Sequence, residues 1–271
     1  MILTFYSYKG GVGRSMALAN VADTLARQGL RVLMIDFDLE APGLEQFFPI
    51  NHNQVRAHSG LVDLLLSYKQ AMSQASSVDL EQSSFRQLKD LFIVPVYDQL
   101  PSGGRLDLLP AGQRGDEEQL ANYALSLRTF DWQDFYFNWA GELFFDWLRR
   151  TLNDLYDLVL VDSRTGVTEM GGICAYQLAD SIAMFCASNQ QNLHGTLNVI
   201  QNFFSPRVQM LRRNRPLQLL VVPSRVEQRD NPLLEDFNQR FTQAFASFTP
   251  PELLGAELSF WDLAIPYEPH Y

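Results

Sequence analysis

Short apolar runs alternate with amphipathic stretches along most of this chain. The first run, Ile2 to Tyr6, precedes a stretch in which apolar residues recur at helical spacing, so we expect a helix over residues 15–28 that Gly29 ends. The apolar residues between Arg31 and Asp36 are continuous, which is typical of a buried parallel strand. Strand, loop, helix and strand form a βαβ unit. The pattern therefore predicts an α/β fold.

Further apolar runs end in polar or turn residues and predict additional strands. They lie at 92–96, 106–109, 158–161, 182–187 and 217–222. Helical patterns separate most of them, so we expect a mostly parallel, twisted sheet with helices on both faces. Ligands of such sheets bind beyond the carboxyl ends of the strands. The residues that follow each run are therefore the candidates for a functional site.

The length of 271 residues and the 46% apolar content fit a single domain over residues 1–271, with insertions expected at 50–90 and 116–155. Within the first insertion, residues 73–84 are rich in Ser and Gln and predict a flexible surface loop. The second has a helical pattern that is dense in aromatic residues. Helix packing accounts for roughly half of these rings, and a partner or self-association surface is the alternative for the rest.

A glycine-rich loop, Tyr-Lys-Gly-Gly-Val-Gly-Arg-Ser, joins the first strand to the first helix over residues 8–15. Its glycines let backbone N–H groups turn toward one point, where the start of the helix adds a partial positive charge. This arrangement is typical of phosphate binding, although a tight turn that caps a helix is an alternative. The expected nucleotide-binding residues here are Gly10, Gly11, Val12, Gly13, Arg14, Ser15 and Met16.

The loop differs from the ordinary pattern G-x-x-x-x-G-K-[ST] at two positions. Tyr8 replaces the first glycine, and Arg14 replaces the phosphate-binding lysine. Arginine keeps the charge and can bind phosphate oxygens through its planar guanidinium, but it is bulkier than lysine. The sequence therefore supports nucleotide binding better than hydrolysis.

Carboxylates follow two of the predicted strands. Asp36 and Asp38 are two residues apart, so we expect them on the same side of the chain, and Asp162 follows the run at 158–161. Magnesium nucleotides need hard oxygen ligands, and a hydrolase needs a group that orients water. The expected metal-site residues are Ser15, Asp36, Asp38 and Asp162; the Ser15 hydroxyl can also cap the helix.

The motifs at 9–15, 36–44 and 162–166 resemble the deviant Walker loop and the two switches of the MinD/ParA family of dimeric P-loop ATPases. The resemblance covers nearly the whole chain and implies ATP and Mg²⁺ as ligands, with a homodimer in the ATP state. It implies that Lys9 reaches the partner's nucleotide and that Asp38 contacts the catalytic water. Asp162 would hold Mg²⁺ through water.

The same resemblance assigns further roles. Lys9, Arg14 and Asp38 are the expected catalytic residues, and the Gly166 N–H is expected at the γ-phosphate. Arg164 has three open interpretations: a phosphate contact, a pair with Asp38, or solvent. The loop variant resembles a bacterial subgroup found as modules of larger signalling or defence proteins, and the ending at residue 271 suggests a module of a longer chain.

Base recognition has a weaker sequence signal. The guanine motif Asn-Lys-x-Asp does not follow the strand at 217–222, so adenine is favoured. In adenine-binding members of the family the base lies where this chain has Arg225 and Pro266, which implies stacking or backbone contact there. Residues 108–112, Leu-Leu-Pro-Ala-Gly, predict a strand-end turn near the interface without a chemical role.

The net charge of −10 argues against nonspecific attraction to DNA or anionic lipid. One basic cluster, Arg207, Arg212, Arg213 and Arg215, leaves DNA as a lesser alternative to an unidentified effector protein. Cys174 and Cys186 lack metal-site spacing, which favours buried thiols in a reducing cytoplasm and disfavours an iron–sulfur reductase. Neither a secretory signal nor a membrane span is predicted, so we expect a cytoplasmic protein without a membrane partner.

Two functions follow from these residues. The first is an ATP-dependent dimerising switch, reset by slow Mg²⁺-dependent hydrolysis of ATP. The second is a nucleotide sensor that binds without turnover, because Arg14 replaces lysine. The first makes the protein a weak ATPase, and the second makes it a binding module.

Overall fold

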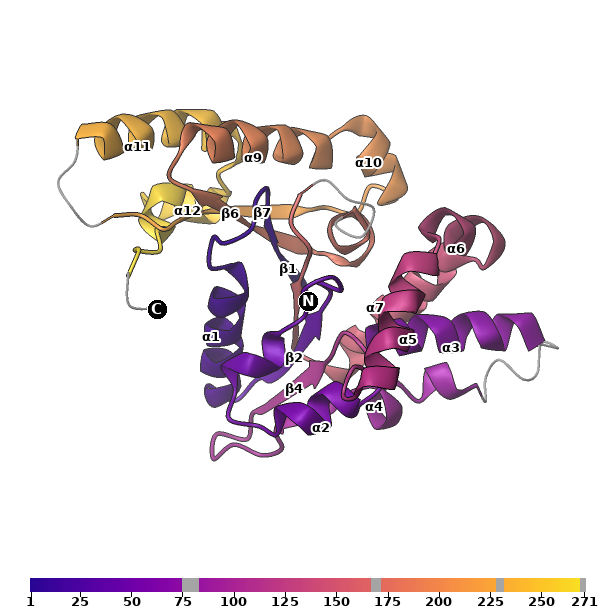
Figure 1. Ribbon diagram of the computed structural model, residues 1–271. Helices are drawn as coiled ribbons and strands as arrows, with labels where there is room; N and C mark the ends of the chain where they lie inside the picture. Colours follow the sequence, from indigo (N-terminus) through magenta and orange to yellow (C-terminus); the bar gives the residue numbers. More distant parts are fainter. Residues whose placement is uncertain (75–82, 167–171, 228–231, 269–271) are drawn as a thin grey trace. The chain divides into compact units, whose positions relative to one another are not determined.

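The computed structural model describes residues 1–74, 83–166, 172–227 and 232–268 (Figure 1). These residues divide into two compact units. Unit 1 contains Met1 and residues 18–162, and unit 2 contains residues 2–17 together with the chain from Ser163 onward. The glycine loop therefore belongs to unit 2, whereas Asp36, Asp38 and Asp162 belong to unit 1.

Unit 1 contains four strands in the order β3-β4-β2-β5. β2 (Arg31–Asp36) lies between β4 (Arg105–Leu109) and β5 (Leu158–Asp162) and is parallel to both, as the sequence predicts. β3 (Val94–Tyr97) is antiparallel to β4 and starts two residues later than the expected run. Pro95 lacks an N–H donor, which an outer strand such as β3 tolerates.

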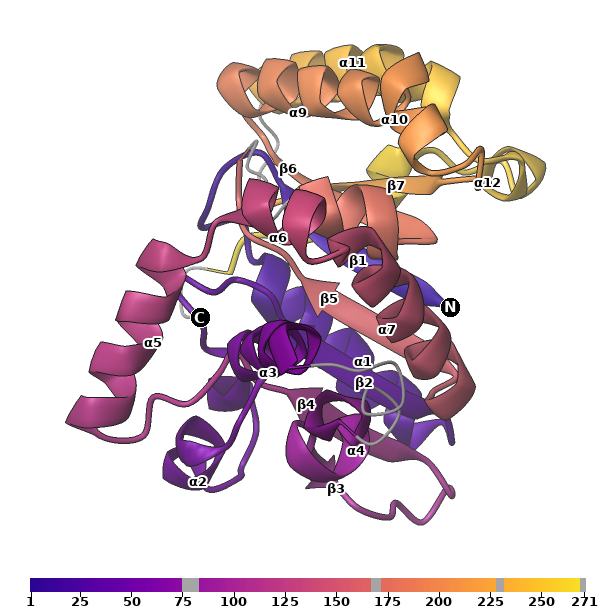
Figure 2. The same cartoon turned by 90° about the vertical axis from the view of Figure 1, so that its right-hand side faces the viewer.

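Helices connect these strands. They are α1 (Arg14–Arg27), which begins in unit 2, η1 (Leu44–Phe47), α2 (His52–Ala57), α3 (Leu61–Gln74), η2 (Ser84–Arg86), α4 (Leu88–Leu91), α5 (Glu117–Thr129), α6 (Trp132–Asn138) and α7 (Gly141–Leu155). α1 confirms the predicted helix to within one residue, and Gly29 follows it with φ +103°. α7 runs beside β5 in Figure 2. α5, α6 and α7 confirm the helical pattern of residues 116–155. Most of the predicted loop at 73–84 lies outside the described residues.

The aromatic side chains of α5 to α7 pack mainly on one another and on α3. The rings of Tyr68 and Phe135 lie 5.8 Å apart, and those of Tyr68 and Phe144 lie 4.8 Å apart. Phe137, by contrast, is 86% exposed. Packing therefore accounts for more than the expected half of these rings. The reason is that aromatic side chains of α3, α6 and α7 pack on one another in one cluster, and not only on the sheet.

Unit 2 contains three parallel strands in the order β1-β6-β7. They are β1 (Ile2–Ser7), β6 (Ser181–Ala187) and β7 (Gln218–Ser224), at the predicted positions. α9 (Gln190–Phe203) and α11 (Pro232–Phe245) lie side by side along β6 and β7 in Figures 1 and 2. The other helical elements are the π-helical turn η3 (Ile173–Leu178), α10 (Pro206–Leu211), η4 (Ala246–Phe248), α12 (Pro251–Gly255) and η5 (Phe260–Leu263).

The core of unit 2 explains why α11 docks on the sheet. Phe237, Phe241 and Phe245 recur every four residues, so they share one helix face, and all three are buried. They pack in one cluster with Ile182 of β6 and Val221 of β7. Across the described ranges of both units, no helix is long and apolar enough to cross a membrane.

Candidate functional site

The glycine loop of unit 2 has its backbone turned outward at the start of α1. Gly11 and Gly13 have φ values of +73° and +80°, which glycine adopts most readily, and both residues are exposed, as is Gly10. The Gly13 carbonyl accepts a hydrogen bond from the Ala17 N–H at 2.9 Å, which begins the helical pattern. The loop therefore offers accessible N–H groups at a helix N-terminus, which is suitable geometry for an anion.

Tyr8, at the position of the missing glycine, packs against α9. A Cβ atom added to Gly195 would lie 2.2 to 2.6 Å from three atoms of the Tyr8 ring, so only glycine leaves room for the ring at this point of the helix. The Tyr8 ring thus packs against the backbone of α9 at Gly195 in unit 2. The sequence alone gave no reason to connect positions 8 and 195.

The side chain of Arg14 points into unit 2. Its side chain is buried, and Nη1 donates to the Ser7 hydroxyl at 3.4 Å. Burial raises the pKa of the neighbouring Tyr6 phenol, and the Arg14 charge opposes part of that effect. Val12 is also buried, whereas Lys9 and Ser15 are half-buried and Met16 is 40% exposed. The guanidinium therefore lies where the loop meets the end of β1.

The chain after Asp162 returns to β1. The Ser163 hydroxyl donates to the Phe5 carbonyl at 2.9 Å, and the Gly166 N–H donates to the Ser7 carbonyl at 3.2 Å. In this structure the Gly166 N–H is therefore bonded to the backbone of β1, and its contact with a γ-phosphate stays a prediction. Gly166 has a φ of +79°, a backbone conformation that glycine adopts most readily. Arg164 is half-buried.

The two residues expected at the base lie close to each other in unit 2. Val226, next to Arg225, forms a parallel bridge with Pro266. Nη1 of Arg225 donates to the Gly11 carbonyl at 3.0 Å, and its guanidinium carbon lies 4.7 Å from the centre of the Tyr267 ring. Arg225 thus connects the end of β7 to the glycine loop. Its contact with a base stays a prediction.

The acidic pair of unit 1 is buried at the ends of two neighbouring strands. Asp36 and Asp162 are direct register partners, and they are 1% and 3% exposed. Oδ2 of Asp36 accepts from the N–H groups of Gly43 and Leu44 at 2.9 and 3.2 Å, whereas Oδ1 is buried without a hydrogen-bond partner. Burial, assisted by the charge of Asp162, raises the pKa of Asp36 to about 7.

This pair fits a divalent cation. An unpartnered carboxylate oxygen in an acidic pair is stabilised when a cation compensates both charges. Among residues 1–74, 83–166, 172–227 and 232–268, no three His, Cys, Asp or Glu side chains form a ready-made metal cage. Magnesium at nucleotide sites takes most of its ligands from phosphate and water, so an acidic pair suits an ion that arrives with a nucleotide.

Asp38 lies beyond the end of β2 in irregular backbone and is half-buried. Asp38 is outside the strand, so the loop after β2 sets its position relative to Asp36. The expected alternation of side chains along a strand does not apply to it. Burial raises the pKa of Tyr123, and the charges of Asp36 and Asp38 add to this effect, so each carboxylate acts on the phenol. Tyr123 belongs to α5, and its hydroxyl donates to the Leu39 carbonyl at 2.7 Å.

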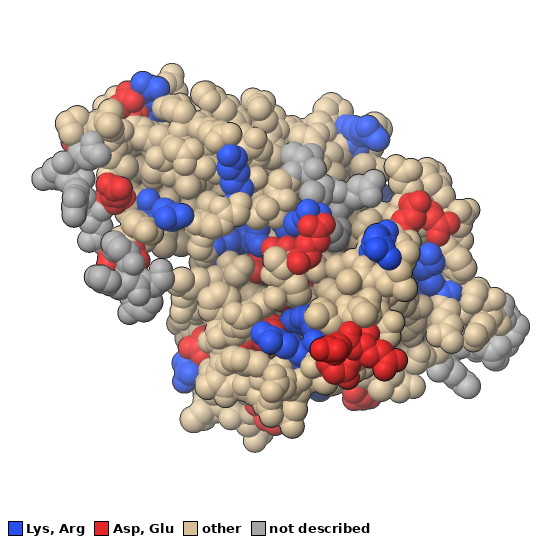
Figure 3. Space-filling model, viewed as in Figure 1, with Lys and Arg blue, Asp and Glu red and all other residues tan. Residues whose placement is uncertain are grey.

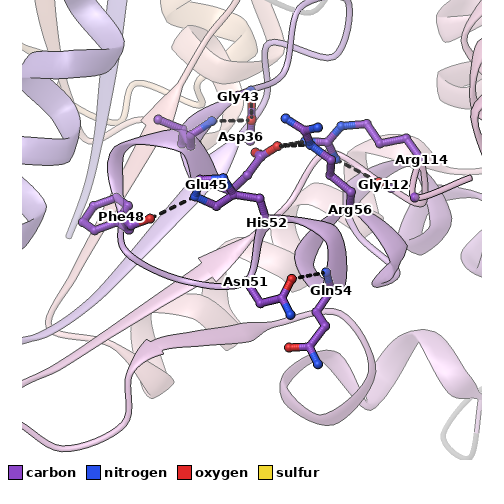
Figure 4. A network of polar contacts seen from close by, with 12 residues as sticks. Asp36, Gly43, Glu45, Phe48, Asn51, His52, Gln54, Arg56, Gly112 and Arg114 are labelled. Atoms are coloured by element: carbon purple, nitrogen blue, oxygen red, sulfur yellow. Dashed lines mark hydrogen bonds and ion pairs between the residues drawn. The ribbon is translucent and has the colours of Figure 1, made fainter.

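Sequence reasoning missed the charged network beside this pair (Figure 4). Glu45 is 1% exposed and accepts from Nη2 of Arg114 at 2.9 and 3.0 Å and from Nε of Arg56 at 3.0 Å. Nη1 of Arg114 donates to the Gly112 carbonyl at 3.0 Å. No local signal indicates this network, because Glu45 and Arg114 are 69 positions apart in the chain.

The segment 108–112 has a structural role. The carbonyls of Pro110 and Ala111 accept from the N–H groups of Leu61 and Val62, which start α3. The ring of Tyr123 covers Gly112, where an added Cβ would lie 2.9 Å from it. These contacts agree with the predicted strand-end turn, and its lack of a chemical role stays a prediction.

The structure corrects two of the four residues of the predicted basic cluster, Arg212 and Arg215. Arg212 is 4% exposed, and its guanidinium donates to the backbone carbonyls of Ala175, Tyr176, Ala179, Arg215 and Pro216. Arg215 donates to the carbonyls of Tyr176 and Gln177. The guanidinium groups of both arginines therefore bind backbone carbonyls at the end of η3, inside the protein. On the face in Figure 3 basic and acidic groups are interspersed.

Both cysteines are buried thiols without a disulfide, as predicted. Burial raises the pKa of Cys186 to about 12, so its thiolate is disfavoured at neutral pH.

Comparisons with known proteins define the family. The profile described as the CobQ/CobB/MinD/ParA nucleotide binding domain matches residues 3–258, and the chain therefore belongs to this family of nucleotide-binding domains. A ParA family protein of Mycoplasma pneumoniae is 23% identical over 84% of this chain and 72% of its own length. The cytosolic Fe-S cluster assembly factor CFD1 of Yarrowia lipolytica is 43% identical over 54 residues, 20% of this chain and 19% of that protein.

Solved structures show the same fold. The septum site-determining protein MinD of Pyrococcus horikoshii, complexed with Mg-ADP, has a TM-score of 0.53 and 17% identity, with 99% of this chain and 82% of that chain covered. A Cyanothece McdA variant in complex with ATP has a TM-score of 0.58 and 14% identity, with 92% and 80% covered. The expected α/β fold with mostly parallel strands and helices is thus confirmed.

Proposed function

We propose that this protein is an ATP-dependent dimerising switch that hydrolyses Mg·ATP slowly. The observation that carries the proposal is the exposed glycine loop at the start of α1, in a chain that matches a nucleotide-binding family over residues 3–258. The loop N–H groups bind the phosphates, as a deviant Walker loop does. Ser15, Asp36 and Asp162 serve the magnesium ion, directly or through water.

The remaining roles complete the switch. Asp38 orients the attacking water, and Lys9 completes the site of the second copy. Arg225 and Pro266 contact the adenine base, and an effector protein reads the ATP-bound dimer. The Mg-ADP and ATP bound by the structural relatives support the choice of ligands.

A second candidate is a nucleotide sensor without turnover. The burial of Arg14 and its contact with Ser7 favour the sensor. The guanidinium is directed at the end of β1, so it must turn before it can follow the charge that develops on a leaving phosphate. Both candidates predict nucleotide binding, and they differ in phosphate release.

Mass determination in solution tests the switch. We expect Mg·ATP to convert the wild type from monomer to dimer and to leave Lys9→Ala monomeric with ATP still bound. Lys89→Ala, which alters an exposed lysine of α4, is the matched control and should dimerise. Unchanged mass for the wild type at saturating Mg·ATP would refute the switch.

Phosphate release then separates the two candidates. Asp38→Ala should lower the rate by about 100-fold while ATP affinity stays within about twofold, because orientation of water contributes to turnover and not to ground-state binding. Equal rates for the wild type and Asp38→Ala would favour the sensor.

A further inference from the structure

The segment 37–45 of unit 1, which carries Asp38, is held from several directions. At its start, the Phe37 N–H donates to the Asp162 carbonyl at 3.0 Å. Toward its end, the N–H groups of Gly43 and Leu44 donate to Asp36, and the next residue, Glu45, binds two arginines. Both ends of the segment are therefore fixed to the body of unit 1.

The hydroxyl of Tyr123 contacts the middle of the segment. It donates to the Leu39 carbonyl at 2.7 Å, in a bond buried from solvent, and Leu39 itself is 1% exposed. Burial and the nearby Asp36 carboxylate raise the pKa of Tyr123, so the hydroxyl keeps its proton and remains a donor. Since Leu39 follows Asp38 directly, this bond fixes the backbone next to the carboxylate.

We propose that Tyr123 is a positioning residue, whose hydroxyl holds the Leu39 carbonyl and so fixes the direction of the Asp38 carboxylate. The proposal rests on the proposed function, in which Asp38 orients the attacking water. Tyr123 does not touch the nucleotide in this scheme; it acts through the backbone of residues 38 and 39.

The rest of α5 supports this role. The Tyr123 ring rests on Gly112, and Arg114 binds Glu45 from the same connection between β4 and α5. The β4–α5 connection and α5 thus contact the Asp38 segment both in its middle and at its end. Small displacements of a catalytic group lower turnover strongly and leave ground-state binding almost unchanged.

Tyr123→Phe is the direct test, because it removes the hydroxyl and keeps the ring that packs on Gly112. Tyr68→Phe is the matched control: the Tyr68 hydroxyl of α3 donates to the Trp139 carbonyl at 2.9 Å, elsewhere in unit 1. Tyr123→Phe removes the donor to the Leu39 carbonyl, and Tyr68→Phe removes the donor to the Trp139 carbonyl together with a 3.4 Å bond to the Ala140 carbonyl. The general loss of stability should therefore be no larger for Tyr123→Phe than for Tyr68→Phe.

Two measurements decide the proposal. The first is hydrogen exchange of residues 37–44 in nucleotide-free protein, which Tyr123→Phe should accelerate by about tenfold and Tyr68→Phe should not change. The second is turnover: Tyr123→Phe should lower phosphate release by about tenfold, with ATP affinity within about twofold of the wild type.

The possible failures are distinguishable. Unchanged exchange in 37–44 would overturn the proposal whatever the protein hydrolyses, and so would faster exchange with unchanged turnover. Equal effects of the two tyrosine variants on turnover would also overturn it. If the wild type itself releases no phosphate, the hydrolysis part of the proposed function fails, and the exchange comparison alone decides whether Tyr123 holds the segment.

Discussion

Replacement of Asp36 by Asn should stabilise the nucleotide-free protein at neutral and higher pH. Asp36 is buried beside Asp162, and its pKa is raised from 3.8 to about 7. At 1.36 kcal/mol per pKa unit, this corresponds to about 4 kcal/mol of cost for keeping the carboxylate charged. Asn has nearly the same shape and keeps an oxygen for the N–H groups of Gly43 and Leu44.

The sign of the pH dependence follows from proton binding. Unfolded Asp36 loses its proton near pH 3.8, whereas folded Asp36 keeps it until near pH 7. Between these values the folded state binds more protons, so the free energy of unfolding falls as pH rises, and the full cost is present above pH 7. The expected gain of Asp36→Asn at pH 8 is about 2 to 4 kcal/mol.

Urea unfolding without nucleotide or magnesium, from pH 4 to pH 8, measures this effect. Trp132, Trp139 and Trp147 lie in unit 1, so their fluorescence reports mainly on the unit that contains Asp36. Circular dichroism provides a second probe of whether the transition is two-state. The gain of Asp36→Asn should be largest at pH 8 and should disappear toward pH 4.

Asp157→Asn is a control of opposite sign. Its hydrogen bonds with Arg31 lower the pKa of Asp157 to about 2. The charged carboxylate therefore stabilises the folded protein above pH 3.8, and this stabilisation is lost as pH falls through about 2. Because the pair is largely exposed, we expect only a small loss at pH 8. An Asp36→Asn variant no more stable than the wild type at pH 8, or a gain independent of pH, would refute the reasoning.

Two further predictions concern unit 2. Gly195→Ala would place a Cβ 2.2 Å from the Tyr8 ring. The resulting shift should lower the free energy of unfolding in urea by about 1 to 3 kcal/mol and weaken ATP binding in calorimetry. Gly255→Ala, with no neighbour within 4 Å, should change neither quantity. Arg212→Met should cost about 3 kcal/mol in the same unfolding assay because it leaves several backbone carbonyls without donors. Arg207→Met, which alters an exposed residue of the same cluster, should have little effect, and equal losses would contradict the contacts described for Arg212.

The sequence by itself determined the elements and the family. The continuous apolar run between Arg31 and Asp36 is typical of a buried strand, and Gly11 and Gly13 of the loop have backbone angles that other residues avoid. Such signals are local, since strand period, helix period and glycine content act within a few residues. They were sufficient to locate the glycine loop and Asp36, Asp38 and Asp162.

Only the tertiary structure decided which side chains support those residues. Tyr123 reaches Leu39 across 84 positions, and Arg212 reaches the end of η3 across more than 30. Such contacts depend on how helices dock on strands, and a polar side chain looks alike in sequence whether it is solvated or buried against a carbonyl. For that reason Arg212 resembled part of a DNA-binding surface, and Tyr123 was predicted only as one aromatic residue among many.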